Sequence, residues 1–361
     1  MKMANVTDIK LNEESVTFPL WIIISYYGFV LVGLILNVCI SIRLMQRKER
    51  GIFSLILHLT LVDALSTFVA VIEIWIINKQ SWIFPAKLCR FFSGGEMLIN
   101  TFVLYEIICI NFHVTSTLNL YLQEIQNDSK SPISLSEEED SDQFLVSHEE
   151  QNYNRNVVID YRRRKTDIAI LIPLFLVWFV GLSASIPQFT LSTTVTVQNN
   201  ITLCTVFDIY HKRLLQNLSI VFRIIIPVPL LFLSLVILIT KSYKSMHTTN
   251  LGQNLLARKT KKVQSILVLG TVLTVLYIIV SLQRQILAIL HFFAQEVGTT
   301  NSADNFKIPP LQNVACSSFA NLLSAMSHYA CSTLRPIIYI VVLPELRYMF
   351  NFKQKLKCNK K

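Results

Sequence analysis

Charged residues are scarce in this sequence of 361 residues: they make up 16%, whereas hydrophobic residues make up 52%. A soluble protein of this size has about 25% charged residues. The scarcity argues against a soluble globular protein and predicts an integral membrane protein. The net charge is nevertheless +10. Because the basic residues fall mostly in the predicted loops and tail, where they orient membrane helices, we expect the lipid bilayer and not nucleic acid as a partner.

Motifs for catalysis and metal binding are also lacking. The seven cysteines form no CxxC pair, and no His/Cys cluster has the spacing of a metal site. The sequence has no nucleophile-and-base arrangement and no glycine-rich phosphate loop. It has no repeat of fixed period, and no cleavable signal peptide is evident. We therefore expect no enzyme activity, no cofactor and no bound metal.

Long apolar segments are abundant. A membrane-spanning helix needs roughly 20 mostly apolar residues. The segments that meet this requirement are 19–44, 53–78, 89–115, 167–190, 214–240, 263–293 and 311–343. They predict an all-α membrane protein, a seven-transmembrane helix bundle over 19–343. An N-terminal segment, 1–18, precedes it, and a C-terminal segment, 344–361, follows it.

The distribution of Lys and Arg in the loops predicts the orientation of the bundle. The loop 241–262 has six Lys or Arg residues and no acidic residue, and the first loop and the tail are also basic. Positively charged loops stay in the cytoplasm. We therefore expect the N-terminus outside and the C-terminus in the cytoplasm. The sequons at Asn5 and Asn200 then lie outside, as N-glycosylation requires.

The segment 116–166 is predicted to be a long second cytoplasmic loop. It contains ten of the 23 acidic residues of the chain, including the run SEEEDSD at 136–142. Its polarity and weak periodicity predict disorder. Two interpretations remain: a solvated spacer, or a regulatory segment in which Ser134 and Ser136 are phosphorylated.

The segment 344–361 resembles an amphipathic helix at the membrane surface. A proline suits its first turn. One face carries apolar side chains and the opposite face is basic; the apolar residues are Leu346, Met349, Phe350 and Leu356. Cys358 lies among lysines and is either a palmitoylation site or an exposed thiol.

Residues in nearly every predicted helix resemble those of rhodopsin-like (class A) G-protein-coupled receptors. The first helix has GLILNV with Asn37, the second has LTLVD with Asp63, and the seventh has Pro336-Ile-Ile-Tyr339. Further matches are Trp82, Cys89, Trp178, Pro187, Cys204 and Pro227. The resemblance covers about 19–352. It implies a multi-pass protein of the plasma membrane that binds an extracellular ligand and signals to a heterotrimeric G protein or to arrestin by rearrangement of the helices.

The resemblance also implies a disulfide between Cys89 and Cys204, the two cysteines predicted on the oxidising outer face. This bond would hold the second extracellular loop over the start of the third helix. Thr and Val alternate in that loop around Asn199-Asn200, which predicts a β-hairpin, with an unstructured loop as the alternative. In the family, a hairpin at this place is common among peptide receptors.

Five ionisable residues within the helices match pocket-facing positions of the family: Glu73, Glu96, Arg284, His328 and Tyr329. Ionisable groups inside membrane helices are functional candidates. In one interpretation the two carboxylates bind a cationic ligand, such as a peptide arginine or an amine. In the other, one of them pairs with Arg284. We expect a peptide or a small cationic ligand, and no partner for Glu106 is evident from the sequence.

Three positions depart from the family. His113 stands where the third helix has the arginine of an Asp-Arg-Tyr motif, the sixth helix lacks the Trp-x-Pro switch, and Arg335 replaces the asparagine before Pro336. These departures favour a second hypothesis, a seven-helix chemosensory or non-coupling receptor. A transporter or channel is a third, less favoured because no internal repeat is present.

Arg335 has its own expected role. In the family, the aspartate that Asp63 matches helps to hold a sodium ion together with the asparagine that Arg335 replaces. We expect the guanidinium to take the place of that ion and to form a buried pair with Asp63. Arginine suits this role because it can bind a carboxylate through two parallel hydrogen bonds. The alternative is that Arg335 extends toward the cytoplasmic interface. Asn37, Pro336 and Tyr339 complete the predicted switch region.

Overall fold

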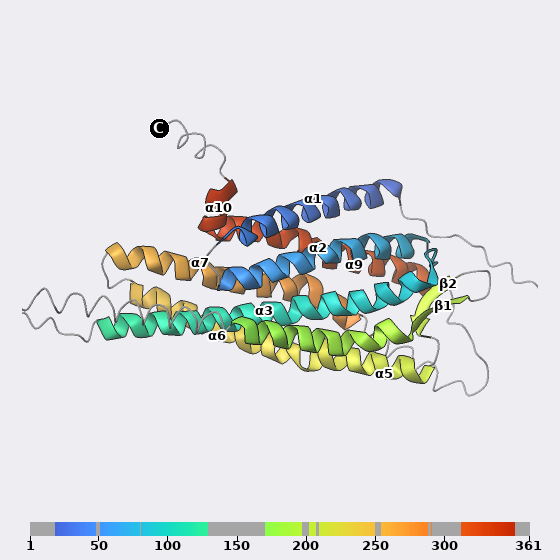
Figure 1. Cartoon of the computed structure of the whole chain (residues 1–361). Coiled ribbons are helices and arrows are strands. Elements are labelled where there is room, and N and C mark those ends of the chain that lie inside the picture. The colour runs from blue at the N-terminus through green and yellow to red at the C-terminus, as the bar shows by residue number, and fades with distance from the viewer. Residues whose placement is uncertain are drawn as a thin grey trace, which may run out of the picture.

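Long helices packed side by side make up the protein (Figure 1). The computed structural model describes residues 19–47, 51–79, 81–128, 170–196, 202–206, 209–249, 254–287, 290 and 312–350. The helices are α1 (Leu20–Met45), α2 (Ile52–Lys79), α3 (Ala86–Asp128), an unlabelled helix (Ile170–Leu191), α5 (Ile209–Ile220), α6 (Pro227–Thr249), α7 (Asn254–Leu276), α9 (Gln312–Val342) and α10 (Pro344–Phe350). The fold is therefore mostly helical, as the sequence predicts.

Six helical stretches are long and apolar enough to cross a membrane. They are Leu20–Met45, Ile52–Lys79, Ala86–Asn119, Ile170–Leu191, Arg213–Tyr243 and Gln264–Leu287. The protein is thus a multi-pass helical membrane bundle. The seventh predicted segment corresponds to α9, which is 31 residues long and packs on α1 and α2. Its described part is less apolar because it carries His328, Arg335 and several hydroxyl residues, and it is not among the six.

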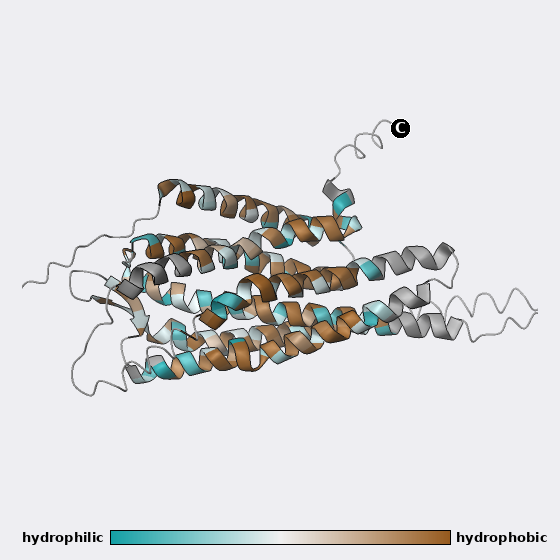
Figure 2. Ribbon diagram, turned by 180° about the vertical axis from the view of Figure 1, so that it is seen from behind, coloured by the Kyte–Doolittle hydropathy of each residue, from teal (hydrophilic) through white to brown (hydrophobic). Residues whose placement is uncertain are grey.

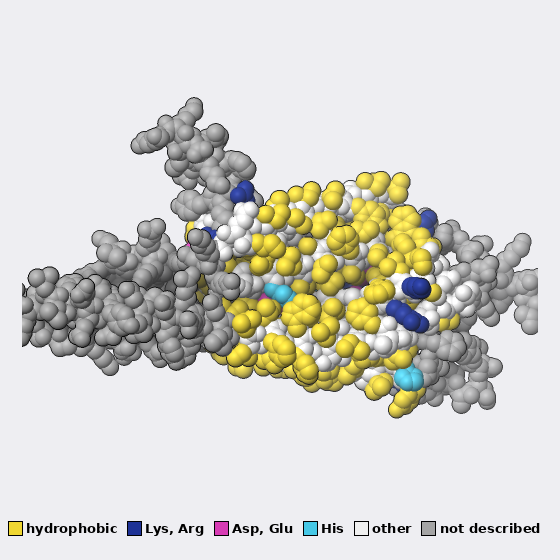
Figure 3. All heavy atoms as spheres, viewed as in Figure 1, with side chains coloured by type: hydrophobic (Ala, Val, Ile, Leu, Met, Phe, Trp, Pro, Cys, Tyr) yellow, Lys and Arg dark blue, Asp and Glu magenta, His cyan; other side chains and the backbone are white. Residues whose placement is uncertain are grey.

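The outer surface of the bundle is strongly apolar. Brown ribbon covers the middle of the helices in Figure 2, and hydrophobic side chains form a broad band in Figure 3 with Lys and Arg toward its ends. Large side chains such as Trp21 (69% exposed) and Phe175 (70% exposed) point outward. A continuous exposed apolar surface of this kind marks a membrane-facing region.

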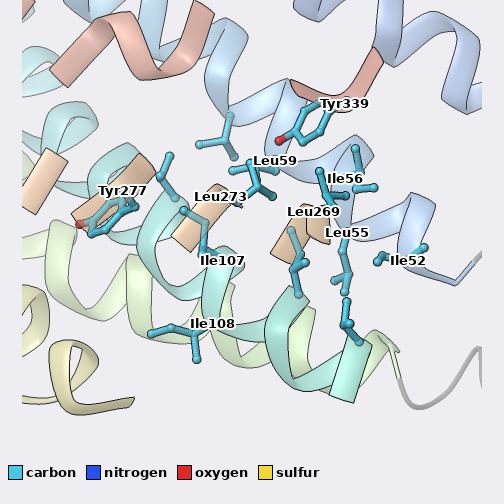
Figure 4. Packing of buried hydrophobic residues seen from close by; sticks show 14 of the residues in the cluster. Ile52, Leu55, Ile56, Leu59, Ile107, Ile108, Leu269, Leu273, Tyr277 and Tyr339 are labelled. Carbon is cyan, nitrogen blue, oxygen red and sulfur yellow. The ribbon is translucent and has the colours of Figure 1, made fainter. Parts of the chain in front are cut away.

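The core is formed mainly by α2, α3 and α7. In Figure 4, Leu59 of α2 lies near Leu273 of α7, and Leu55 of α2 lies near Leu269 of α7. All four are almost fully buried. Lipid tails are as apolar as leucine, so close packing holds such helices together more than the hydrophobic effect does.

Close packing also explains Gly33 in α1. A Cβ atom at this position would lie 2.2 Å from Thr333 Oγ1 of α9. Only glycine permits this approach of the two helices, and small residues at helix contacts are typical of membrane bundles.

A two-stranded antiparallel hairpin covers one end of the bundle. Strand β1 (Ser192–Thr196) pairs with β2 (Thr202–Val206), with Thr194 opposite Cys204. A disulfide joins Cys204 to Cys89 in the first turns of α3. Both the hairpin and the disulfide are confirmed. We call this the hairpin end; α10 lies at the opposite end (Figure 1).

Two short π-helical turns interrupt the apolar helices. One spans Val221–Ile225, between α5 and α6, and the other spans Tyr277–Ser281 and follows α7. Neither contains proline, and the sequence does not predict either turn. A π-turn adds one residue to the helical repeat, and such turns are frequent at functional sites.

The predicted boundary between the third helix and the loop 116–166 changes. Helix α3 continues to Asp128 instead of ending near 115, because Leu118 is still fully buried beyond the predicted end and the helix keeps its packing there. The tail helix begins at Pro344 as predicted, and its described part ends at Phe350. Several predicted sites lie outside the described residues: Asn5, Ser134, Ser136, Asn200 and Cys358.

Candidate functional site

Four of the predicted pocket residues meet at the hairpin end of the bundle. The Arg284 guanidinium donates to a carboxylate oxygen of Glu73 and, at 3.2 Å, to Glu96 Oε1. The Tyr329 hydroxyl donates to the other oxygen of Glu73, and the guanidinium lies over the Tyr329 ring at 5.2 Å. Arg284 therefore makes two ion pairs and a cation–π contact. We call Glu73, Glu96, Arg284 and Tyr329, together with Arg223, the charged cluster.

The contacts decide how the two carboxylates are neutralised. The sequence left open whether one of them pairs with Arg284, and in the structure both do. The side chains of Arg284, Glu73 and Glu96 remain 15%, 14% and 26% exposed. The cluster is therefore internally paired and still within reach of the outside of the bundle.

Arg223 belongs to the same cluster and was missed from the sequence. Its π-turn position lets the guanidinium reach Gln285 Oε1 and the backbone carbonyl oxygen of Glu96, each at 3.5 Å. The available signal was an arginine inside the apolar run SIVFRIIIPVP, which marks a functional candidate in a membrane helix.

His328 lies beside the charged cluster but bonds elsewhere. Its Nε2 is 2.8 Å from Asn100 Oδ1, so Nε2 donates and Asn100 accepts. Asn100 is one helical turn beyond Glu96 on α3, and His328 packs its ring against Tyr329. The structure thus brings all five predicted pocket residues to one region, together with Asn100, Arg223 and Gln285.

A second ionic contact lies deeper in the bundle, between α2 and α9. Arg335 donates to Asp63 Oδ1, and the two residues are 3% and 0% exposed. The expected contact is present, and its burial rules out an arginine extended to the interface. The second of the two parallel hydrogen bonds that arginine can make is not formed, because Asp63 Oδ2 has no partner among the described residues. One guanidinium nitrogen reaches the carboxylate instead of two.

Neighbouring contacts tie this pair into the helices. Asn37 Nδ2 donates to the backbone oxygen of Ser332 at 2.9 Å, which joins α1 to α9. Pro336 lies within α9, and Tyr339 is fully buried. The predicted switch residues therefore all lie on the facing surfaces of α1, α2 and α9.

Two further polar contacts were not predicted. Glu106 of α3, which lacked an evident partner, has Oε2 3.0 Å from His58 Nδ1 of α2. Asn111 Nδ2 donates to Ser234 Oγ at 2.9 Å and to Thr274 Oγ1 at 2.7 Å. This second contact fastens α3 to α6 and α7. Each of these residues is a single polar group within an apolar run, and the run does not reveal which partner faces it.

A cleft of about 480 Å³ opens near the α10 end. It is lined by Gln264, Ser265, Val268, Val341, Val342 and Pro344. Close by, Arg47 pairs with Glu345 at 3.2 Å and lies over the Phe53 ring. The cleft is thus formed by α7, the end of α9 and the start of α10.

The described residues contain no group of three side chains able to hold a metal ion. No protein-family model matches the chain, and no curated protein matches it. The resemblance to class A receptors therefore rests on the residues quoted above.

Proposed function

We propose that the chain is a plasma-membrane receptor of seven helices, similar to class A G-protein-coupled receptors. Helix α9 is its seventh membrane helix, the hairpin end faces outward, and the α10 end faces the cytoplasm. The observation that carries the proposal is the charged cluster beneath a disulfide-anchored hairpin. A buried but reachable ionic cluster at the outer end of a bundle suits ligand binding better than it suits stability alone.

The ligand we propose is a peptide. Support comes from the hairpin, which leaves the charged cluster partly exposed, and from the number of polar groups that surround the cluster. No catalytic constellation accompanies the cluster in the described residues, and a receptor needs none.

The signal passes along helices that reach both ends. Arg284 of the charged cluster and Gln264 of the cleft belong to one apolar stretch, Gln264–Leu287, so a shift at Arg284 moves the wall of the cleft. The Asn111 contacts and the Asp63–Arg335 pair lie between Arg284 and the cleft, and they stabilise one packing of the helices. A ligand that favours a second packing of these helices would open the cleft to a G protein or arrestin.

A second candidate is a receptor that signals without a G protein. It is favoured by His113, which stands at the position of the arginine that contacts the G protein in the family. In that case the cleft and the segment 116–166 would recruit arrestin or another partner directly.

The test is a screen of peptides and amines on cells that express the full chain. Arrestin recruitment and activation of each G-protein class are recorded in parallel. We expect a peptide response that Arg284→Ala abolishes at equal surface level, whereas Ile83→Ala, at an exposed position of the same end, preserves it. Arrestin recruitment alone would select the second candidate. Ligand-dependent ion current or solute uptake without either response would reject both.

A further inference from the structure

Arg223 carries a charge that no carboxylate neutralises by direct contact in the described part of the chain. Glu73 and Glu96 both contact Arg284. Arg223 reaches only uncharged oxygens, of Gln285 and of the Glu96 backbone, each at 3.5 Å, which is long for a hydrogen bond. Charged groups within membrane segments almost always pair. Arg223 is therefore the cation of the charged cluster that can still form an ion pair with a further anion.

Hydrogen-bond donors around Arg223 are also unpaired. Arg223 Nε, Arg284 Nη1 and Asn100 Nδ2 are buried and have no hydrogen-bond partner among the described residues. Asn100 itself is only 5% exposed. Buried polar groups are normally bonded. Both arginines contact Glu96, and Asn100 lies one turn further along α3, so the three donors belong to residues that contact Glu96 or lie one turn from it.

We propose that these donors bind a carboxylate of the ligand, the C-terminal carboxylate of a peptide. The proposal rests on the proposed receptor function and names the chemistry of its ligand. A carboxylate accepts several hydrogen bonds, and an arginine donor gives the strong, charge-assisted kind. His328 Nδ1 is an acceptor when Nε2 donates to Asn100, and it has no hydrogen-bond partner in the described part of the chain. It complements the amide N–H that adjoins a peptide's terminal carboxylate.

The charge around the site agrees with an anionic ligand. Exposed basic residues lie at the hairpin end, namely Lys79, Lys87 and Arg90. A positive rim attracts anions to the site and speeds their arrival. The ligand charge is thus the reverse of the cationic ligand expected from the sequence, because both glutamates are already engaged by Arg284.

The experiment compares two probes that differ only in this group. N-acetyl-L-phenylalanine and N-acetyl-L-phenylalaninamide are titrated onto the full chain in lipid nanodiscs, and binding is measured by saturation-transfer NMR at millimolar concentration. We expect the acid to bind about tenfold more tightly than the amide. 3-Phenylpropionate has the carboxylate but no adjoining N–H. If this probe binds more weakly than the acid, the site recognises the carboxylate of a peptide terminus and not any carboxylate.

Variants assign the preference to Arg223. Arg223→Gln should reduce the preference for the acid to less than about twofold, and Arg223→Lys should keep it. Arg347→Gln, at an exposed position of α10 at the opposite end of the bundle, should not change it. If thermal unfolding shows that Arg223→Gln does not fold, the Asn100→Ala variant tests the proposal instead. This variant removes a hydrogen-bond donor without changing the charge of the site. It should weaken binding of the acid by about threefold and leave binding of the amide unchanged.

Several results overturn the inference. They are equal binding of acid and amide, no binding of the acid, equal binding of 3-phenylpropionate and the acid, a preference that survives Arg223→Gln, or an unchanged acid affinity in Asn100→Ala. The receptor proposal is judged separately. A signalling response only to peptides without a carboxylate would end this inference and leave the receptor standing. Acid-selective binding without any signalling would end the receptor proposal alone.

Discussion

His58 of α2 and Glu106 of α3 face each other inside the bundle, with Nδ1 and Oε2 3.0 Å apart. Glu106 is completely buried, and the His58 ring packs near Phe102 and Trp178, at centroid distances of 5.7 and 5.8 Å. Packing against these rings holds the imidazole in place, so packing positions the one polar partner that the Glu106 carboxyl group has among the described residues.

Removing His58 should leave Glu106 without its partner. We expect His58→Ala to lower the free energy of unfolding by about 1–3 kcal/mol, because a buried polar group loses its hydrogen bond. Replacing Glu106 by Gln in the same background should recover part of this loss, since an amide carries no charge. Thermal unfolding in detergent measures both effects. His113→Ala, at a histidine of α3 outside this contact, is the control. Identical midpoints for the single and double variants would contradict the pairing.

The Asp63–Arg335 pair should show strong coupling in a double-mutant cycle. Either single change, Asp63→Asn or Arg335→Asn, strands a buried charge and should cost about 3–5 kcal/mol. The double variant should be more stable than the sum of the two losses predicts. Surface expression and thermal unfolding report the outcome, and additive losses would show that the two residues do not interact.

The Asp63–Arg335 pair also predicts that sodium does not change the thermal stability of the protein. Because the guanidinium already contacts Asp63, a sodium ion has no charged oxygen to bind there without breaking the pair. We expect thermal unfolding to be the same in sodium and in N-methylglucamine chloride at equal ionic strength. A specific stabilisation by sodium would contradict the prediction.

Arg284 should be more costly to remove than either glutamate. Arg284→Ala leaves two carboxylates 14% and 26% exposed without their cation, and we expect a loss of about 3–5 kcal/mol. Adding Glu73→Gln and Glu96→Gln to this variant should restore much of the purified yield and of the unfolding midpoint. If the triple variant is no more stable than Arg284→Ala, the guanidinium does not act by neutralising these carboxylates.

Gly270 of α7 tests the packing around Asn111. A Cβ atom at Gly270 would lie 2.9 Å from Asn111 Oδ1, so Gly270→Ala should cost about 1–3 kcal/mol by overpacking. In an Asn111→Ala background the same change should cost less, because the clashing oxygen is gone. Gly95→Ala is the matched control, since a Cβ there meets nothing within 4 Å. Equal costs in both backgrounds, measured by thermal unfolding, would show that Asn111 is not the obstacle.

Much of the fold follows from the sequence. The length and apolarity of its segments predict the helices, because a bilayer admits few other structures and the backbone must satisfy its own hydrogen bonds there. The alternation of Thr and Val predicts the hairpin. The partner of Arg335 could also be anticipated, since Asp63 occupies a familiar place in a resembling family and a buried arginine requires an acid.

The partners of the other buried polar residues required the tertiary structure. The sequence determines that Glu106, Arg223 and Arg284 lie inside helices, and therefore that each needs a partner. It does not determine the partner, because that depends on how each helix is rotated about its axis against its neighbours. The π-turns at Val221–Ile225 and Tyr277–Ser281 change that rotation by one residue. They set which side chains of α6 and of the helix after α7 face α3. Only the packed bundle decides that Arg284 pairs with both carboxylates of the charged cluster, whereas, of these two glutamates, Arg223 reaches only the backbone oxygen of Glu96.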